Sequence, residues 1–152
     1  MLRTSMIAAA VAAALTAPGP ASAQQAPPGT AAEARAMLDR AVAAVRADKV
    51  KALESFNAGT NGFRDRDLYP FCVDVPAGIY SAHPTLRGKQ VLDPNDGAGH
   101  AYGEAILRGG DTEGTVNEVS YSFPRPSGGG PVPKATYVTK IGDQICGVGY
   151  YQ

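Results

Sequence analysis

The hydrophobic pattern changes after Gly62, and this change constrains the fold of the chain more than any other feature. Over residues 34–56, apolar residues recur at steps of three and four, with charged residues between them. This spacing predicts one long amphipathic helix that ends near residues 57–59. Thr30 and Glu33 are spaced as a capping box at its start. Because the apolar stripe is rich in alanine, we expect it to lie close against a sheet.

After Gly62 the apolar residues alternate with polar ones, as they do in strands. The first two strands form a hairpin, and a loop over residues 84–98 and a short helix over residues 99–107 follow them. The pattern predicts an α+β fold, in which the long helix packs on one face of an antiparallel five-stranded sheet. The predicted strands are residues 68–75, 79–83, 114–123, 132–141 and 144–151.

The first 23 residues have the layout of a secretory signal peptide. Arg3 precedes an apolar run over residues 6–15, and Ala-Ser-Ala at residues 21–23 offers a cleavage pattern of small residues. The run is shorter than the ~20 apolar residues that a membrane span needs; the alternative is an N-terminal anchor helix. We therefore expect export to the periplasm, a disordered proline-rich leader over residues 24–30 and a single domain over residues 31–152.

The charges of the chain balance, with 14 lysines and arginines against 14 aspartates and glutamates. A nucleic-acid-binding surface would leave a basic excess, and so would a surface that docks on anionic lipid, so we expect neither partner. No GxSxG or other nucleophile motif occurs, so we expect a protein that is not an enzyme. His83 and His100 lie far apart and the cysteines lack ligand spacing, so we expect no metal and no cofactor.

Two cysteines, Cys72 and Cys146, lie 74 positions apart in the sequence. In an exported protein such a pair is more often a disulfide than a metal site or a nucleophile. The alternative is two free, buried thiols.

Several short segments follow one another in a specific order. The end of the long helix is followed by Gly-Phe-Arg-Asp-Arg-Asp-Leu-Tyr, then by Ala-His-Pro and Gly-Lys, then by Pro-Lys-Ala-Thr-Tyr-Val, Gly-Asp and Gly-Val-Gly-Tyr. The segments are residues 44–56, 62–69, 82–84, 88–89, 133–138, 142–143 and 147–150. In order and spacing they resemble the single Cache domain, the extracytoplasmic relative of PAS sensor domains, from about Ala34 to Tyr151.

The resemblance implies a PAS-like sheet whose first and last strands are neighbours, which would bring Cys72 and Cys146 within reach of a disulfide. It also implies that a small molecule, often a short carboxylate, binds between the loops and the sheet face opposite the long helix. The chain resembles free-standing exported members of the family, so we expect neither a transmembrane helix nor an output domain after Tyr151. A membrane-bound signalling or transport protein is the partner that we then expect.

Five side chains are candidates to hold such a ligand, because a cation or a fixed hydroxyl can pair with a carboxylate. They are His83, Tyr102, Tyr121, Lys134 and Tyr137. Strand alternation places Lys134 and Tyr137 on opposite faces unless a bulge intervenes, whereas the resemblance favours both. The alternatives are a solvated lysine and tyrosines that pack in the core. The sequence thus predicts a small-molecule sensor or binding module, and the rival is an adaptor that binds a protein partner without a small ligand.

Overall fold

Two consecutive helices form the N-terminal layer of the structure. The computed structural model describes residues 26–93 and 101–152, and the predicted signal peptide lies outside these ranges. Helix α1, Ala31–Ala47, starts with the predicted capping box, in which the Thr30 hydroxyl accepts from the N–H of Glu33 and the Glu33 carboxylate accepts from the N–H of Thr30. No helix in the described ranges combines the length and the apolar character that a bilayer crossing demands.

The single long helix predicted from the periodicity is wrong in one respect, because it is interrupted at Asp48. This residue has an extended backbone, with φ −159° and ψ 96°, and its carboxylate accepts a hydrogen bond from the N–H of Lys51. Asp48 therefore ends α1 and caps helix α2, Lys49–Ala58. The apolar spacing continues on both sides of Asp48, so the periodicity contains no sign of the break. Gly59, with φ +67°, ends α2 where the sequence predicts.

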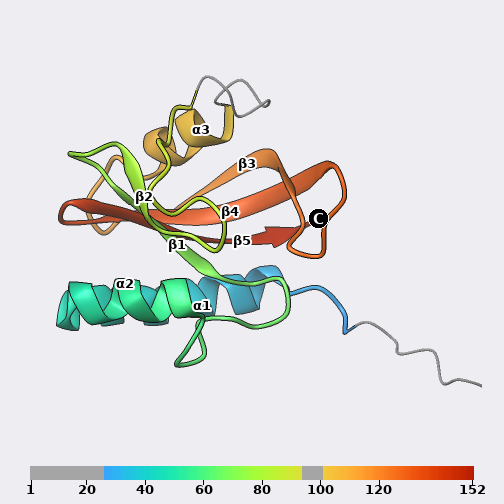
Figure 1. Ribbon diagram of the computed structural model, residues 1–152, viewed down its shortest axis with the longest axis horizontal. Coiled ribbons are helices and arrows are strands. Elements are labelled where there is room, and N and C mark those ends of the chain that lie inside the picture. The colour runs from blue at the N-terminus through green and yellow to red at the C-terminus, as the bar shows by residue number, and fades with distance from the viewer. Residues whose placement is uncertain (1–25, 94–100) are drawn as a thin grey trace, which may run out of the picture.

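Five antiparallel strands form one sheet in the order β2-β1-β5-β4-β3, as Figure 1 shows. The strands follow the predicted ranges closely. They are β1 Pro70–Asp74, β2 Ile79–Ala82, β3 Asn117–Pro124, β4 Pro131–Ile141 and β5 Gln144–Tyr151. The first and last strands are paired neighbours, as the PAS-like arrangement implies.

Different helices cover the two faces of the sheet (Figure 1). Helices α1 and α2 lie against one face, and α3, Ala101–Gly109, lies against the other face over β3 and β4. Each face has its own buried apolar cluster. The first cluster includes Met37, Leu38 and Phe56, and the second includes Phe71, Tyr80 and Ile106. The predicted α+β architecture is confirmed, with the long helical segment on one face of the sheet.

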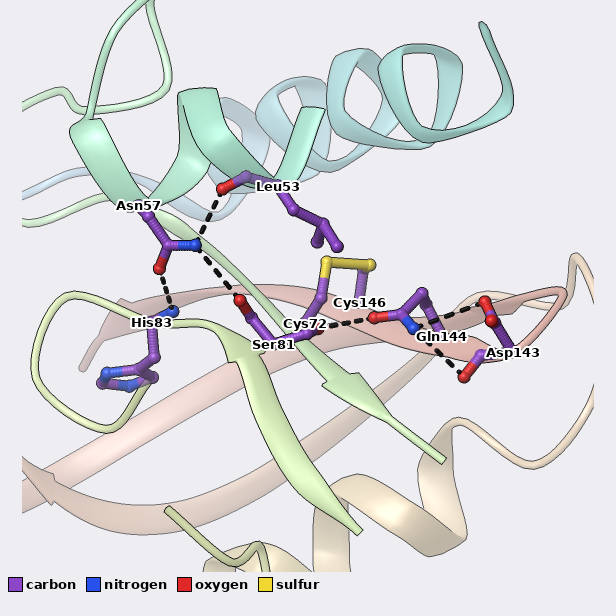
Figure 2. The surroundings of a disulfide bond; sticks show 8 residues. All are labelled: Leu53, Asn57, Cys72, Ser81, His83, Asp143, Gln144 and Cys146. Atoms are coloured by element: carbon purple, nitrogen blue, oxygen red, sulfur yellow. Dashed lines mark hydrogen bonds between the residues drawn. A yellow bond between two sulfur atoms is a disulfide. The ribbon is translucent and has the colours of Figure 1, made fainter. Parts of the chain in front are cut away.

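A disulfide joins Cys72 of β1 to Cys146 of β5 (Figure 2). The two residues are direct partners in the β1–β5 register, and their Cα atoms are 4.1 Å apart. Both are fully buried, and the side chain of Leu53 in α2 is directed at them from the helical layer. The disulfide predicted from the sequence is therefore confirmed.

Part of the leader that was predicted to be disordered is held against the domain. Gly29 is buried, and its N–H donates to Oδ1 of Asp67 at 2.7 Å. The Arg66 guanidinium donates to the carbonyl oxygens of residues 27–28. A Cβ atom at position 29 would overlap Leu68, so this close approach requires glycine. Residues 27–29 are therefore held in place ahead of α1, because side chains of the segment before β1 bind their backbone.

Candidate ligand-binding site

The sheet face opposite α1 and α2 carries the candidate site. Four of the five side chains predicted from the sequence lie together there and line one small inner cavity, which adjoins a larger cleft. His83 follows the end of β2, and the other three come from α3, β3 and β4. The four are His83, Tyr102, Tyr121 and Lys134.

Tyr137 does not belong to this group. It follows Lys134 by three positions on β4, and β4 pairs with both neighbouring strands in continuous register, so alternation turns Tyr137 to the other face. There its ring lies 5.9 Å from that of Tyr150, measured between centroids, and 5.9 Å from the guanidinium of Arg35 in α1. The pleat of the strand thus separates Tyr137 from the other four candidates.

Lys134 is the most deeply buried cation of the site, with 2% of its surface exposed. Its Nζ donates to the hydroxyl of Tyr69 at 3.0 Å. The same atom lies 4.5, 4.8 and 5.2 Å from the ring centroids of Tyr69, Tyr151 and Phe123. Among the described residues, no carboxylate lies within ion-pair distance of it. Lys134 is therefore a buried amine in an aromatic setting and not a solvated surface charge.

The environment of Lys134 acts on its charge in two directions. Burial lowers the pKa of Lys134 to about 7, and the carboxylate of Asp67 opposes this shift. The three ring faces also favour the ammonium form. Near neutral pH the amine is therefore divided between its charged and neutral forms, and a carboxylate in contact with Nζ would favour the charged one.

Glycine at position 149 makes this placement of the lysine possible. The Lys134 side chain extends across β5, where a Cβ atom on Gly149 would overlap its Cε atom and lie 2.5 Å from Oγ1 of Thr136. Gly147, two positions earlier, leaves room in the same way for the ring of Phe71, whose Cζ would lie 2.7 Å from an added Cβ. The Gly-Val-Gly segment of β5 thus opens the sheet face under the site.

His83 is held as a neutral imidazole. Its Nδ1 accepts hydrogen bonds from the N–H groups of Thr85 and Leu86, both at 3.1 Å, and this assigns the ring proton to Nε2. Burial, with smaller contributions from the charges of Lys134 and Arg64, lowers the pKa of His83 to about 3. At physiological pH His83 therefore offers an N–H donor and carries no charge.

Asn57 fixes the backbone of His83 from the helical layer, as Figure 2 shows. Its amide nitrogen donates to the carbonyl oxygens of Leu53 at 2.9 Å and Ser81 at 3.1 Å. Its amide oxygen accepts from the N–H of His83 at 3.2 Å. The C-terminal end of α2 is thereby tied to the end of the strand that carries the imidazole.

Aromatic rings form the wall between the inner cavity and the larger cleft. The centroid of Phe123 lies 5.3 Å from that of Tyr102 and 5.8 Å from that of His83. The Tyr121 hydroxyl accepts from Oγ1 of Thr136 at 2.9 Å, and burial raises the pKa of Tyr121, so the phenol stays neutral. The Tyr121 hydroxyl and the Nε2–H of His83 are therefore polar groups held in fixed positions among apolar side chains.

The larger cleft has a volume of about 910 Å³. Arg125 lines it and lies over the ring of Tyr151, 4.5 Å from the centroid, with Nη1 3.4 Å from Oδ2 of Asp67. Four prolines contribute apolar surface to the wall: Pro84, Pro124, Pro126 and Pro131. A mostly apolar cleft with a few placed polar groups is the usual form of a small-molecule site.

In residues 26–93 and 101–152, no three His, Cys, Asp or Glu side chains come together in the way that a metal ion would require. His100, the second histidine of the sequence, lies outside these residues.

Three neighbours of Lys134 were missed by the sequence analysis: Tyr69, Phe123 and Tyr151. Alternation along β3 places Phe123 on the same face as Tyr121, so this residue could have been found. Tyr151 is the register partner of Lys134, and finding it requires knowing that β4 pairs with β5. Tyr69 lies just before β1, and in the sheet β5 lies between β1 and β4. Finding that Tyr69 contacts the Lys134 amine therefore requires knowing the order of the strands in the sheet.

The sequence matches no protein-family model and no curated protein, whereas several solved structures are similar. One is a methyl-accepting chemotaxis protein from Vibrio parahaemolyticus RIMD 2210633, with a TM-score of 0.59 and 24% identity over 79% of this chain and 86% of that chain. Another is the periplasmic sensor domain of a chemotaxis protein, with a TM-score of 0.54 and 24% identity over 77% of this chain and 86% of that chain. A third is a Cache chemosensory domain that recognises carboxylic acids. It has a TM-score of 0.52 and 21% identity over 76% of this chain and 84% of that chain.

This chain has the Cache fold. The fold expected from the order of the sequence segments is confirmed. In this Cache fold the inner cavity lies on the sheet face opposite α1 and α2. The cleft lies beside it, between the end of β3, the turn from β3 to β4, the residues after β2 and the start of α3. The resemblance predicts a ligand between that sheet face and the loops.

Proposed function

We propose that this chain is a sensor or binding module that holds a short organic acid beside Lys134. The buried amine carries the proposal, because an ammonium removed from water is costly unless an opposite charge compensates it. Among the described residues, no carboxylate oxygen lies within ion-pair distance of the Nζ atom of Lys134. A ligand carboxylate would supply that charge, and binding would then stabilise the ammonium.

The surroundings of Lys134 support an acid as the ligand class. The Tyr69 hydroxyl and the Nε2–H of His83 offer neutral polar contacts, while the aromatic rings provide apolar surface for a short carbon chain. The similar Cache chemosensory domain with carboxylic acid recognition supports the same class.

We also propose that the protein works outside the cytoplasm. The layout of residues 1–23 and the buried disulfide both fit an oxidising, extracytoplasmic compartment such as the periplasm. A membrane-bound signalling or transport protein is the proposed partner that receives the loaded module. Binding without turnover is the proposed activity.

A thermal-shift screen of the mature chain tests the function directly. The panel contains short organic acids, amino acids and amines. We expect saturable stabilisation by one class of acid, because a ligand at 100 times its Kd stabilises the fold by about 2.7 kcal/mol. A flat response together with a recovered protein partner would favour an adaptor, and turnover of a panel compound would favour an enzyme; either result would overturn the proposal.

The affinity for the acid should depend on pH in one direction. The pKa of Lys134 is about 7 in the free protein, and a bound carboxylate raises it. Above pH 7, binding must therefore take up a proton, and the affinity should fall by about tenfold per pH unit. Below pH 7 the amine is already charged, so the affinity should level off.

Calorimetry in buffers with different ionisation heats measures this proton uptake. At about pH 8 the uptake should approach one proton per ligand, and at about pH 6 it should be small. Equal affinities at both pH values, with no proton uptake, would mean that Lys134 does not pair with the ligand.

A further inference from the structure

The buried amine and the large cleft do not meet directly. Lys134 lines only the inner cavity, which has a volume of about 10 Å³, roughly the room that one water molecule needs. Three side chains line both the inner cavity and the cleft of about 910 Å³, namely His83, Tyr102 and Phe123. A carboxylate that enters from the cleft must pass one of these three or Tyr69, which lines the cleft and accepts from Nζ at 3.0 Å. Tyr69 is 5% exposed and is held by that hydrogen bond, so the route past it is closed by a contact to the amine itself.

Two of the three are held firmly. The His83 ring accepts two backbone hydrogen bonds at Nδ1, and its centroid lies 5.4 Å from those of both Tyr69 and Tyr80. Tyr102 is 8% exposed and belongs to α3, where the next residue, Gly103, fits so closely against the carbonyl oxygen of Val91 that a Cβ atom would overlap it. Displacing either ring would disturb backbone contacts.

Phe123 is held differently. It lies on β3, which is an edge strand, it is only partly buried, and its ring has no polar atom to anchor it. The ring covers the amine, with its centroid 5.2 Å from Nζ of Lys134, and its other side faces the large cleft. A rotation about χ1 of Phe123 would move the ring towards a space that can receive it and would open the inner cavity.

We propose that Phe123 is the specificity-determining gate between the cleft and Lys134, and that it restricts the ligand to short-chain acids. The inference rests on the proposed function, since it names which acids that site would accept. With the ring displaced, the space beside Nζ is still bounded by Phe71, Tyr80 and Tyr121, all of which contribute to the wall of the inner cavity. A chain of a few carbons would take the room that the ring vacates, whereas a longer or aromatic chain would extend into the part of the cleft that the displaced ring occupies.

The selectivity among acids tests the gate. Acetate, butyrate, hexanoate and benzoate are titrated into wild-type protein and into Phe123→Ala by calorimetry. The affinity for hexanoate relative to acetate should rise by about tenfold or more in the variant, because removing a wall relaxes size discrimination. Val119→Ala is the matched control, since Val119 lies on the same strand as Phe123 and lines neither cavity, and its hexanoate-to-acetate ratio should stay near that of the wild type. An unchanged ratio in Phe123→Ala would overturn the gate.

A second measurement needs no ligand. Reductive methylation with formaldehyde and cyanoborohydride modifies lysine amines, and peptide mass spectrometry reads the rate at each one. Lys134 should react about tenfold faster in Phe123→Ala, while Lys51, with its side chain 82% exposed, should react at the same rate in both proteins. Phe123→Leu keeps more of the packing and should give an intermediate rate, so it replaces the alanine variant if that one does not fold.

The two experiments separate the gate from the proposed function. If Lys134 is labelled faster in Phe123→Ala but no acid binds the wild type, the result would support the gate and contradict the proposal that the ligand is an acid. If an acid binds, but the labelling rates and the selectivity are equal in all variants, the result would support an acid ligand and contradict the gate.

Discussion

Replacing Lys134 by methionine should weaken the binding of a short acid about thirtyfold or more. Methionine keeps the apolar stem of the side chain and removes only the charge. Loss of one partner of a desolvated charge pair costs about 2–5 kcal/mol of binding free energy. Calorimetry with an acid identified in the thermal-shift screen measures the change.

The same substitution should make the folded protein more stable. The pKa of Lys134 is about 7 in the fold and about 10.4 in an unfolded chain, so the unfolded state binds more protons between these values. The stability of the wild type therefore rises with pH across this window. At or below pH 7 the buried ammonium costs the fold up to about 5 kcal/mol, which methionine would recover. Urea unfolding of both proteins at pH 6 and pH 10 should show the gain at the lower pH only.

Lys140→Met is the matched control. Lys140 lies on the same face of β4, further along the strand, and does not line either cavity. This variant should bind the acid as the wild type does and should show no such gain in stability. If Lys134→Met bound the acid with unchanged affinity, the amine would not contact the ligand.

Breaking the disulfide should cost the fold about 4 kcal/mol. The bond closes a long loop, since its cysteines lie 74 positions apart in the sequence, so it restricts the unfolded chain strongly. Urea unfolding of the Cys72→Ala/Cys146→Ala variant should show the loss as a lower free energy of unfolding. Reduced wild-type protein is the control for packing, because its two thiols fill nearly the same buried volume. If the oxidised and reduced forms had the same free energy of unfolding, the disulfide would not stabilise the fold by restricting the unfolded chain.

Local signals predicted the elements well because each depends on a few neighbouring residues. The Thr30–Glu33 pair and Gly59 act within one helical turn, and both mark helix ends in the structure. The break at Asp48 escaped the same reasoning. Its flanks keep one apolar stripe, and an aspartate among other charged residues is not distinctive until its backbone is seen to be extended.

The candidate site was predictable only in part, because its parts lie far apart in the sequence. Alternation alone separates Lys134 from Tyr137, and the structure places them on the two faces that alternation requires. Gly149 gave no such signal, since its function is to leave space for a lysine of the neighbouring strand. That space, and the reach of the amine to Tyr69, depend on the order of the strands in the sheet.

The cross-strand sulfur bond also determines the covalent connectivity of the cleft. Together with the chain between its ends, it forms a closed covalent ring that contains β2, α3, β3 and β4. His83, Tyr102, Phe123 and Lys134 all lie inside this ring, and α1 and α2 lie outside it. A protease that cuts one peptide bond in the turns after β2 would therefore release no fragment. The nicked molecule would keep every wall of its cleft, and its two pieces would separate on a gel only after reduction.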